Sequence, residues 1–201
     1  MSFRKFCLPS LIFFAASALV CSAQTKALAN TDVSLDGFYQ TTPTASGNGI
    51  SVKATHSAGG AAFLRHSYHW WLGFEGGYAI TRYTNYYTGQ VFGVQTNMHE
   101  AAGSYLIQGP HALGIQPFAT AGGSAIFFSP SLNGGQNTAW QVRPGINFGV
   151  GVNVPLLTSH LGLRVQYRGV YYKTPDFGQA RYSTGAYRET SEPMAGLYLR
   201  F

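Results

Sequence analysis

The sequence predicts an all-β fold, an eight-stranded antiparallel up-and-down transmembrane β-barrel, on three observations. Apolar and polar residues alternate with a period of two over long stretches after residue 24. Charged residues make up 10% of the 201 residues, whereas a soluble domain carries roughly 25%. Long and short connections alternate between the predicted strands, as they do in up-and-down membrane barrels. A cytosolic enzyme and a coiled coil fit this composition poorly.

The N-terminus, residues 1–23, has the pattern of a secretory signal peptide. Arg4 and Lys5 precede an apolar stretch over 8–20, and Cys21-Ser22-Ala23 places small residues before a cut at Gln24. Cleavage as a lipoprotein at Cys21 is the weaker alternative, because the residue before that cysteine, Val20, is not small. The apolar stretch is also too short for a membrane helix.

Removal of this leader defines the mature chain as a periplasmic segment, 24–32, followed by a barrel over 33–201. Cys7 and Cys21 both leave with the leader, so the mature chain has no thiol and no disulfide. Its eleven basic and seven acidic residues give a mild positive charge. Neither that charge nor the exported location suggests a nucleic-acid partner.

The eight strands follow from the alternation and from the clusters of turn residues between them. The clearest case is 140–154, where Val142, Ile146 and Val150 share one face and glycines and asparagines share the other. The registers of the first, second and fifth strands stay open, because a bulge would reverse their faces. The predicted strands are 33–41, 59–66, 70–84, 94–107, 113–128, 140–154, 161–173 and a last strand that ends at Phe201.

The connections differ in length on the two sides of the predicted sheet. The long ones, rich in Gly, Ser, Thr and Asn, are 42–58, 85–93, 129–137 and 174–188, and the short ones are 67–69, 108–112 and 155–160. The mature chain allows about 22 residues for each of eight strands with its connection, whereas sixteen strands would leave about 11. A wide diffusion pore is therefore not expected.

The apolar face of the strands is predicted to meet lipid. The opposite face is rich in Gly and Asn, which suits the interior of an eight-stranded barrel, where side chains fill the lumen. Trp70 and Trp71 at a short turn and Tyr86 and Tyr87 at a long loop are placed as interfacial girdles would be. The alternative is a soluble exported barrel whose apolar face is an ordinary core around an apolar ligand.

The end of the chain carries the most specific motif. Leu197, Leu199 and Phe201 alternate up to the final residue, and this segment resembles the terminal strand of bacterial outer-membrane barrels, which is read during assembly. Together with 162–169, which looks like their penultimate strand, the pattern resembles the small OmpA-like or opacity-type family. The resemblance implies an outer-membrane location and recognition of Leu197, Leu199 and Phe201 by the assembly machinery. No peptidoglycan-binding domain is expected after the barrel.

Charged residues on the polar face are expected to line the lumen. Since buried charges must pair, we expect a network of ion pairs that plugs the barrel. The alternative is a narrow ion or small-solute channel, which an excess of arginine would make favour anions. The candidates are Arg65, Glu75, Glu100, Arg143, Arg164, Arg168 and Arg200, with Asp36 as a further one.

Catalysis, metal binding and a cofactor are not expected. Two types of enzyme occur on small barrels, lipid A palmitoyltransferases and lipid A deacylases. Resemblance to a deacylase would require a His and a Ser two residues apart on a late strand. His66-Ser67 and His56-Ser57 are adjacent instead. His66 and His69 lack a third metal ligand nearby, and the Gly-rich run at 145–151 precedes no predicted helix that would bind phosphate.

The long loops are the remaining candidate site. Their basic and aromatic residues could contact lipopolysaccharide phosphates or host glycans, and outer-membrane lipid is the other expected partner of a monomeric barrel. The sequence thus favours a passive structural or surface-interaction role, with a channel second and a lipid A-modifying enzyme third. The candidate loop contacts are Lys173, Arg181, Tyr182, Tyr187 and Arg188.

Overall fold

The computed structural model describes residues 30–112, 114–132, 136–137, 140–156 and 160–201. The predicted signal peptide and the segment up to residue 29 lie outside the described residues. Within the described part of the chain, no helix has both the length and the apolar character of a membrane span. The elements are β1 (Thr31–Gln40), β2 (Ala45–Gly47), β3 (Ile50–Ala54), β4 (Ser57–Ser67), β5 (Leu72–Tyr87), β6 (Val94–Gln108), β7 (Gln116–Leu132), β8 (Gln136–Asn137), β9 (Gln141–Pro155), β10 (Leu161–Lys173), the 3-10 helix η1 (Ala180–Tyr182) and β11 (Tyr187–Arg200).

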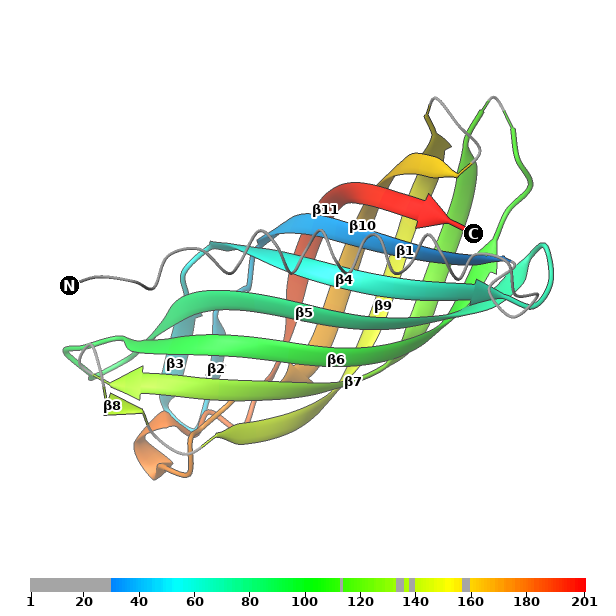
Figure 1. Ribbon diagram of the computed structural model, residues 1–201. Coiled ribbons are helices and arrows are strands. Elements are labelled where there is room, and N and C mark those ends of the chain that lie inside the picture. The colour runs from blue at the N-terminus through cyan, green and yellow to red at the C-terminus, as the bar shows by residue number, and fades with distance from the viewer. Residues whose placement is uncertain (1–29, 113, 133–135, 138–139, 157–159) are drawn as a thin grey trace, which may run out of the picture.

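Eight of these strands form a closed antiparallel barrel. The hydrogen-bonded order is β1-β4-β5-β6-β7-β9-β10-β11, and β11 pairs back with β1 to close the ladder. The closing register runs from Asp32 opposite Arg200 to Phe38 opposite Met194. The short strands β2, β3 and β8 extend one end of the wall (Figure 1). The predicted eight-stranded up-and-down barrel is confirmed.

The barrel has two distinct ends, which are named here by what lies at them. The terminal mouth holds the start of β1, the end of β11 and the short connections β4–β5, β6–β7 and β9–β10. The loop mouth, at the opposite end, holds the longer connections, with η1 close to β2 and β3 (Figure 1). Long and short connections therefore segregate as the sequence predicts.

The first long connection is more ordered than the sequence analysis assumed. The predicted loop 42–58 contains the hairpin β2–β3 and the first residues of β4. Gly47 pairs with Ile50, and the two residues between them, Asn48 and Gly49, have φ values of 51° and 74°. An Asn-Gly pair with two positive φ values makes the tight turn that suits a two-residue hairpin. β3 then pairs with β5, so the hairpin continues the barrel wall.

The two faces of the wall have opposite chemistry. Leu35, Val142, Ile146 and Val150 point outward and are exposed, whereas arginines, asparagines and glycines of the same strands point into the lumen. The small inward residues make room for large neighbours: a Cβ on Gly162 would lie 2.2 Å from the Tyr198 ring. Exposed aromatic residues gather near both mouths, among them Tyr68, Trp70, Trp71 and Tyr105 at one end and Tyr39, Tyr86, Tyr171 and Tyr187 at the other.

Candidate functional site

The lumen next to the terminal mouth contains two buried ion pairs. Arg65 on β4 donates to Glu75 on β5 at 2.5 Å, and Arg164 on β10 donates to Asp32 on β1 at 2.7 Å. No side chain of the four is more than 5% exposed. Charges removed from water to this degree are stable only when paired and fully hydrogen-bonded.

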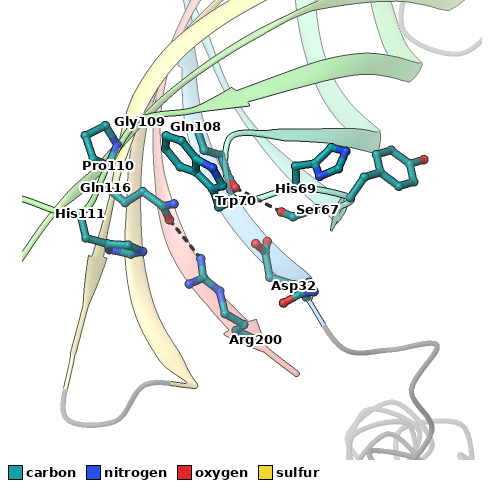
Figure 2. A pocket seen from close by; sticks show the side chains of 12 residues that line it. Asp32, Ser67, His69, Trp70, Gln108, Gly109, Pro110, His111, Gln116 and Arg200 are labelled. Carbon is teal, nitrogen blue, oxygen red and sulfur yellow. Dashed lines mark hydrogen bonds between the residues drawn. The ribbon is translucent and has the colours of Figure 1, made fainter.

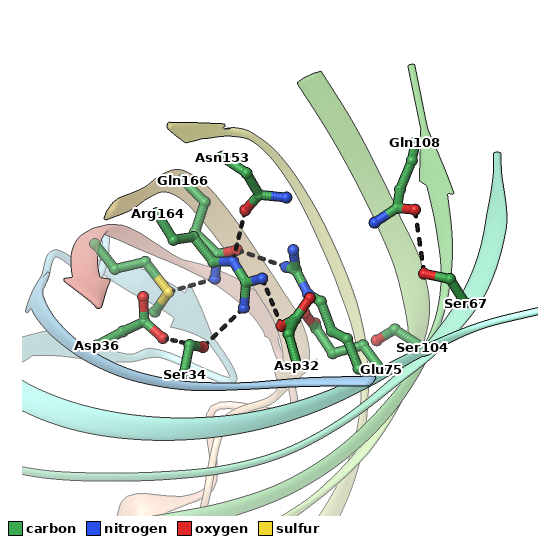
Figure 3. A network of polar contacts seen from close by, with 12 residues as sticks. Asp32, Ser34, Asp36, Ser67, Glu75, Ser104, Gln108, Asn153, Arg164 and Gln166 are labelled. Atoms are coloured by element: carbon green, nitrogen blue, oxygen red, sulfur yellow. Dashed lines mark hydrogen bonds and ion pairs between the residues drawn. The ribbon is translucent and has the colours of Figure 1, made fainter. Parts of the chain in front are cut away.

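Polar side chains from several strands complete this first level (Figure 3). Arg164 also donates to Asn153 at 2.9 Å and to Ser34 at 2.8 Å, and the Ser34 hydroxyl donates to Asp36 at 2.7 Å. Arg65 donates to Gln166 at 3.1 Å, and its guanidinium lies 4.0 Å from the centre of the Phe118 ring. The Arg65 contacts connect β4 with β10 and β7 across the lumen, whereas Arg164 and Asn153 face each other on paired strands.

A three-residue ion cluster forms the next level. The Arg168 guanidinium on β10 donates to both carboxylate oxygens of Glu100 on β6, at 2.5 and 3.0 Å. It also donates to Glu192 on β11 at 2.9 Å. All three residues are buried. Because β6 lies across the lumen from β10 and β11, the cluster ties the two sides of the barrel together.

Toward the loop mouth, Arg188 on β11 is a buried cation with neutral partners. Its guanidinium donates to the hydroxyls of Tyr83 at 3.1 Å and Tyr172 at 3.2 Å and to the Asn85 side-chain oxygen at 3.3 Å. Among the described residues no carboxylate forms an ion pair with it. Arg188 was predicted as an external loop contact. It lies in the lumen instead, because β11 begins at Tyr187 and turns Arg188 inward.

The buried charges of the lumen are close to balanced. In the described part of the barrel four arginines and five carboxylates are buried, whereas the predicted Arg143 and Arg200 lie nearer the two mouths and are partly buried. Asp32 and Glu192 are absent from the predicted lumen charges, because Asp32 falls just before the predicted first strand and the predicted alternation of the last strand covers only its final residues. Continued period-2 alternation from Ser34 and Tyr198 would have identified both. The arginines are Arg65, Arg164, Arg168 and Arg188, and the carboxylates are Asp32, Asp36, Glu75, Glu100 and Glu192.

Two loops cover the loop mouth. The β2–β3 hairpin approaches the β10–β11 connection so closely that a Cβ on Gly47 would lie 2.1 Å from the Thr184 carbonyl oxygen. The Asn48 side chain donates to the Ser183 carbonyl at 3.2 Å. Tyr182 is buried and its ring centre lies 4.6 Å from that of Tyr87. This apolar cluster, termed the cap, comprises Ala45, Val52, Tyr87, Val94 and Tyr182, with Ile50, Phe177 and Ala186 packed against it. Tyr182 is thus a cap residue and not the exposed loop contact that was predicted.

An ion pair fastens the cap to the barrel rim. Arg143 at the start of β9 donates to Asp176 at 2.8 Å, and Gln141 donates to the same carboxylate at 2.7 Å. Partial burial by itself raises the pKa of the Asp176 carboxyl, but hydrogen bonds from Gln141 and Gly178 and the charge of Arg143 outweigh it and lower the pKa below its usual value. Arg143, predicted as a lumen charge, lies on the inward face of β9 and forms its ion pair at the rim of the loop mouth.

The terminal mouth opens into a pocket of about 580 Å³ (Figure 2). Arg200, also predicted as a lumen charge, lies at this rim and donates to Gln116 at 3.4 Å. Ser67 donates to Gln108 at 3.2 Å across the same mouth. The floor of the pocket includes Asp32, which belongs to the first level of ion pairs.

The other predicted residues lie on the outside of the barrel. Arg181 is exposed on η1, and Tyr187 is exposed with its ring stacked 5.5 Å from that of Tyr171. Lys173 is half-buried at the end of β10. Leu197 and Leu199 point outward on β11, and the Phe201 amide donates to the Thr31 carbonyl at 2.9 Å. The described residues contain no group of three or more His, Cys, Asp or Glu side chains that could hold a metal ion.

Comparison with solved structures finds several similar barrels. Neisserial surface protein A is similar with a TM-score of 0.62 and 19% identity, over 86% of this chain and 98% of that one. The outer membrane protein OprG of Pseudomonas aeruginosa gives 0.60 and 12%, over 86% and 96%. The attachment invasion locus protein Ail of Yersinia pestis, in complex with the heparin analogue sucrose octasulfate, gives 0.51 and 14%, over 86% and 99%. No family model and no curated protein matches the sequence. The chain therefore has the fold of small outer-membrane β-barrels.

Replacement of Arg168 by methionine should destabilise the barrel strongly. The Arg168→Met variant leaves Glu100 and Glu192 buried without a cation, which costs about 3–5 kcal/mol for a broken buried pair. Urea-induced unfolding in detergent micelles, followed by circular dichroism, measures this loss.

The matched control is Arg82→Met, which removes an exposed arginine from the outer face and should change the free energy of unfolding by about 1 kcal/mol or less. The triple variant Arg168→Met, Glu100→Gln, Glu192→Gln should recover most of the loss, because no uncompensated charge remains. Equal stability of Arg168→Met and Arg82→Met would contradict the assigned ion cluster.

Loss of the Asp176 charge should loosen the cap. We expect Asp176→Asn to raise amide hydrogen exchange over 174–186 by about two- to fivefold, as suits a partly exposed ion pair. Because the pKa of Asp176 is lowered in the folded protein, its contribution is present above the ordinary carboxyl range and is lost as the pH falls through the lowered value. In the wild type, protection of the 174–186 amides against exchange should thus be constant from pH 8 to about 5 and should decline below about 4.

The control for this experiment is Glu189→Gln on β11, a carboxylate that forms no ion pair within the described residues. Exchange measured by mass spectrometry after correction for the intrinsic pH dependence should be unchanged in that variant. If the amides of 174–186 are protected from hydrogen exchange equally in Asp176→Asn and in the wild type, the ion pair does not fasten the cap.

Proposed function

We propose that this protein is a small outer-membrane barrel, related to the OmpA-like and opacity-type proteins, with a passive structural or surface-interaction role. The observation that carries the proposal is the closure of the lumen. Ion pairs at two successive levels, then Arg188 and the cap, occupy the path between the mouths. A solute would have to separate buried pairs to pass, which costs several kcal/mol for each one.

The outer wall supports placement of the barrel in a membrane. Its outward residues form an apolar surface with aromatic residues toward both mouths, as in barrels whose girdles lie at the two interfaces. The ladder closes through β1 and β11, so within the barrel no strand edge faces lipid with unpaired backbone groups. In this placement the terminal mouth faces the periplasm and the cap faces outward. The assembly machinery would recognise Leu197, Leu199 and Phe201 on the last strand.

The proposed contact surface lies at the loop mouth. Val91 and Phe92, at the tip of the β5–β6 connection, are 89% and 69% exposed. They line a hollow of about 290 Å³ together with Arg181. Lys53 adds an exposed cation on β3. Apolar and cationic groups side by side suit lipopolysaccharide phosphates or anionic glycans, and binding of a heparin analogue by the similarly folded Ail protein supports that class of partner.

Placement is tested by labelling a single introduced cysteine in intact cells. The only natural cysteines, Cys7 and Cys21, lie in the predicted leader. We expect Val91→Cys to react with a membrane-impermeant maleimide in whole cells, and His111→Cys, exposed at the terminal mouth, to react only after the outer membrane is permeabilised. The opposite labelling pattern would reverse the proposed orientation. Equal labelling of the two cysteines, with the protein recovered in the soluble fraction, would contradict the placement in a membrane.

Closure of the lumen is tested by conductance in planar lipid bilayers. Purified wild-type protein, shown to be folded by its heat-dependent migration on gels, should produce no discrete current steps, because the ion cluster at Arg168 spans the lumen. Regular steps in the wild type would instead establish the narrow channel that is the alternative reading of the sequence.

A further inference from the structure

The pocket at the terminal mouth has the composition of a binding site. Amide side chains of Gln108 and Gln116 project from its walls, and both residues are buried. Trp70, 71% exposed, and the imidazole of His111 line the same space. A volume of about 580 Å³ falls in the range of about 300–1,000 Å³ typical of small-molecule sites. A few hydrogen-bonding groups beside a flat aromatic surface are what such sites offer a ligand.

Arg200 is the cationic side chain of this pocket that forms no ion pair within the described part of the chain. In the closing register Arg200 lies directly opposite Asp32. The Asp32 carboxylate, however, accepts from Arg164 at 2.7 Å. Within the described residues Arg200 forms no ion pair, and its side-chain hydrogen bond is the long one to Gln116 (Figure 2). Because Arg164 already neutralises the Asp32 carboxylate, the Arg200 guanidinium is available to bind a ligand.

The ion pairs beneath the pocket are balanced within themselves. Arg164 pairs with Asp32, and Arg65 pairs with Glu75. Asp36, the remaining carboxylate of this level, accepts a hydrogen bond from Ser34 and is not among the residues that line the pocket. The lining charge that has no ion-pair partner among the described residues is therefore the positive one of Arg200. An arginine in such a setting binds a carboxylate through charge-assisted, often paired, hydrogen bonds.

We propose that the terminal mouth binds a carboxylate-bearing sugar of about disaccharide size. Arg200 takes the carboxylate, the amides of Gln108 and Gln116 bond the ring hydroxyls, and Trp70 covers an apolar face of the sugar. The ligand stays at the mouth, because the first level of ion pairs closes the lumen below it. The site is separate from the proposed contact surface at the loop mouth.

The test uses a matched pair of disaccharides on the detergent-solubilised protein, in which both mouths are accessible. Digalacturonic acid carries carboxylates, and galactobiose is its neutral counterpart. Isothermal titration calorimetry should show saturable binding of digalacturonic acid and binding of galactobiose at least about tenfold weaker, as loss of a hydrogen bond to a charged group implies.

Variants assign the binding to the pocket. Arg200→Gln should weaken digalacturonic acid binding at least about tenfold, whereas Arg82→Gln, which removes the same charge from the outer face of β5, should leave it unchanged. Since Arg200 lies on the last strand, folding of each variant is checked by heat-dependent gel migration. Trp70→Ala, on a connection outside that strand, should weaken both sugars. Absence of saturable binding, equal affinity for the two sugars, or equal loss in Arg200→Gln and Arg82→Gln would overturn the proposal.

Discussion

Closure of the backbone ladder between β1 and β11 is the constraint on which the rest of the structure depends. An unpaired N–H or C=O group in hydrocarbon costs several kcal/mol, so a sheet with an apolar outer face must end on itself. Here the pairing of β1 with β11 meets that requirement and also creates the lumen. It brings the start of β1 and the end of β11 to one mouth and sets Asp32 beside the inward residues of the last strands. The ion pair between Arg164 and Asp32, which joins β10 to β1, depends directly on this closure.

A lumen of eight strands is too narrow for charged side chains to keep their water, which explains how the charges are arranged. Arg164 spans from β10 to Asp32 on β1, and Arg168 spans from β10 to Glu100 on β6. Such cross-links replace the hydration that the guanidinium groups lose. Arg188 is stabilised differently, by hydrogen bonds to tyrosine hydroxyls and an amide oxygen. Its guanidinium carbon also lies 5.7 and 5.3 Å from the ring centres of Tyr83 and Tyr172.

The two mouths follow from the same architecture but differ in character. At the loop mouth an apolar cap and the Arg143–Asp176 pair cover the lumen, and the exposed surface lies on the loop tips. At the terminal mouth the short turns leave a hollow whose floor is the first level of ion pairs. Because the interior is closed, ligands and partners can bind only at the two mouths. The proposed contact surface lies at one mouth and the proposed sugar site lies at the other.

The sequence by itself determined eight strands and, for the clearest of them such as 140–154, which face points inward, because alternation with a period of two is a local property and each inward residue is followed by an outward one. Two further local signals are present in it, the Asn48-Gly49 turn of the β2–β3 hairpin and the alternation that makes Asp32 and Glu192 inward. Ion pairs between neighbouring strands, such as that of Arg65 with Glu75, can be predicted from the sequence once the register of the two strands is known.

Only the tertiary structure decided which charges meet across the lumen. Arg164 and Asp32 are 132 residues apart in the chain, and Arg168 and Glu100 are 68 apart. Neither pair lies on neighbouring strands. The same holds for Arg188 and Tyr182, whose place inside the barrel and its cap depends on where β11 begins and on how two loops pack together. These positions depend on the curvature and closure of the barrel, which no local pattern of residues encodes.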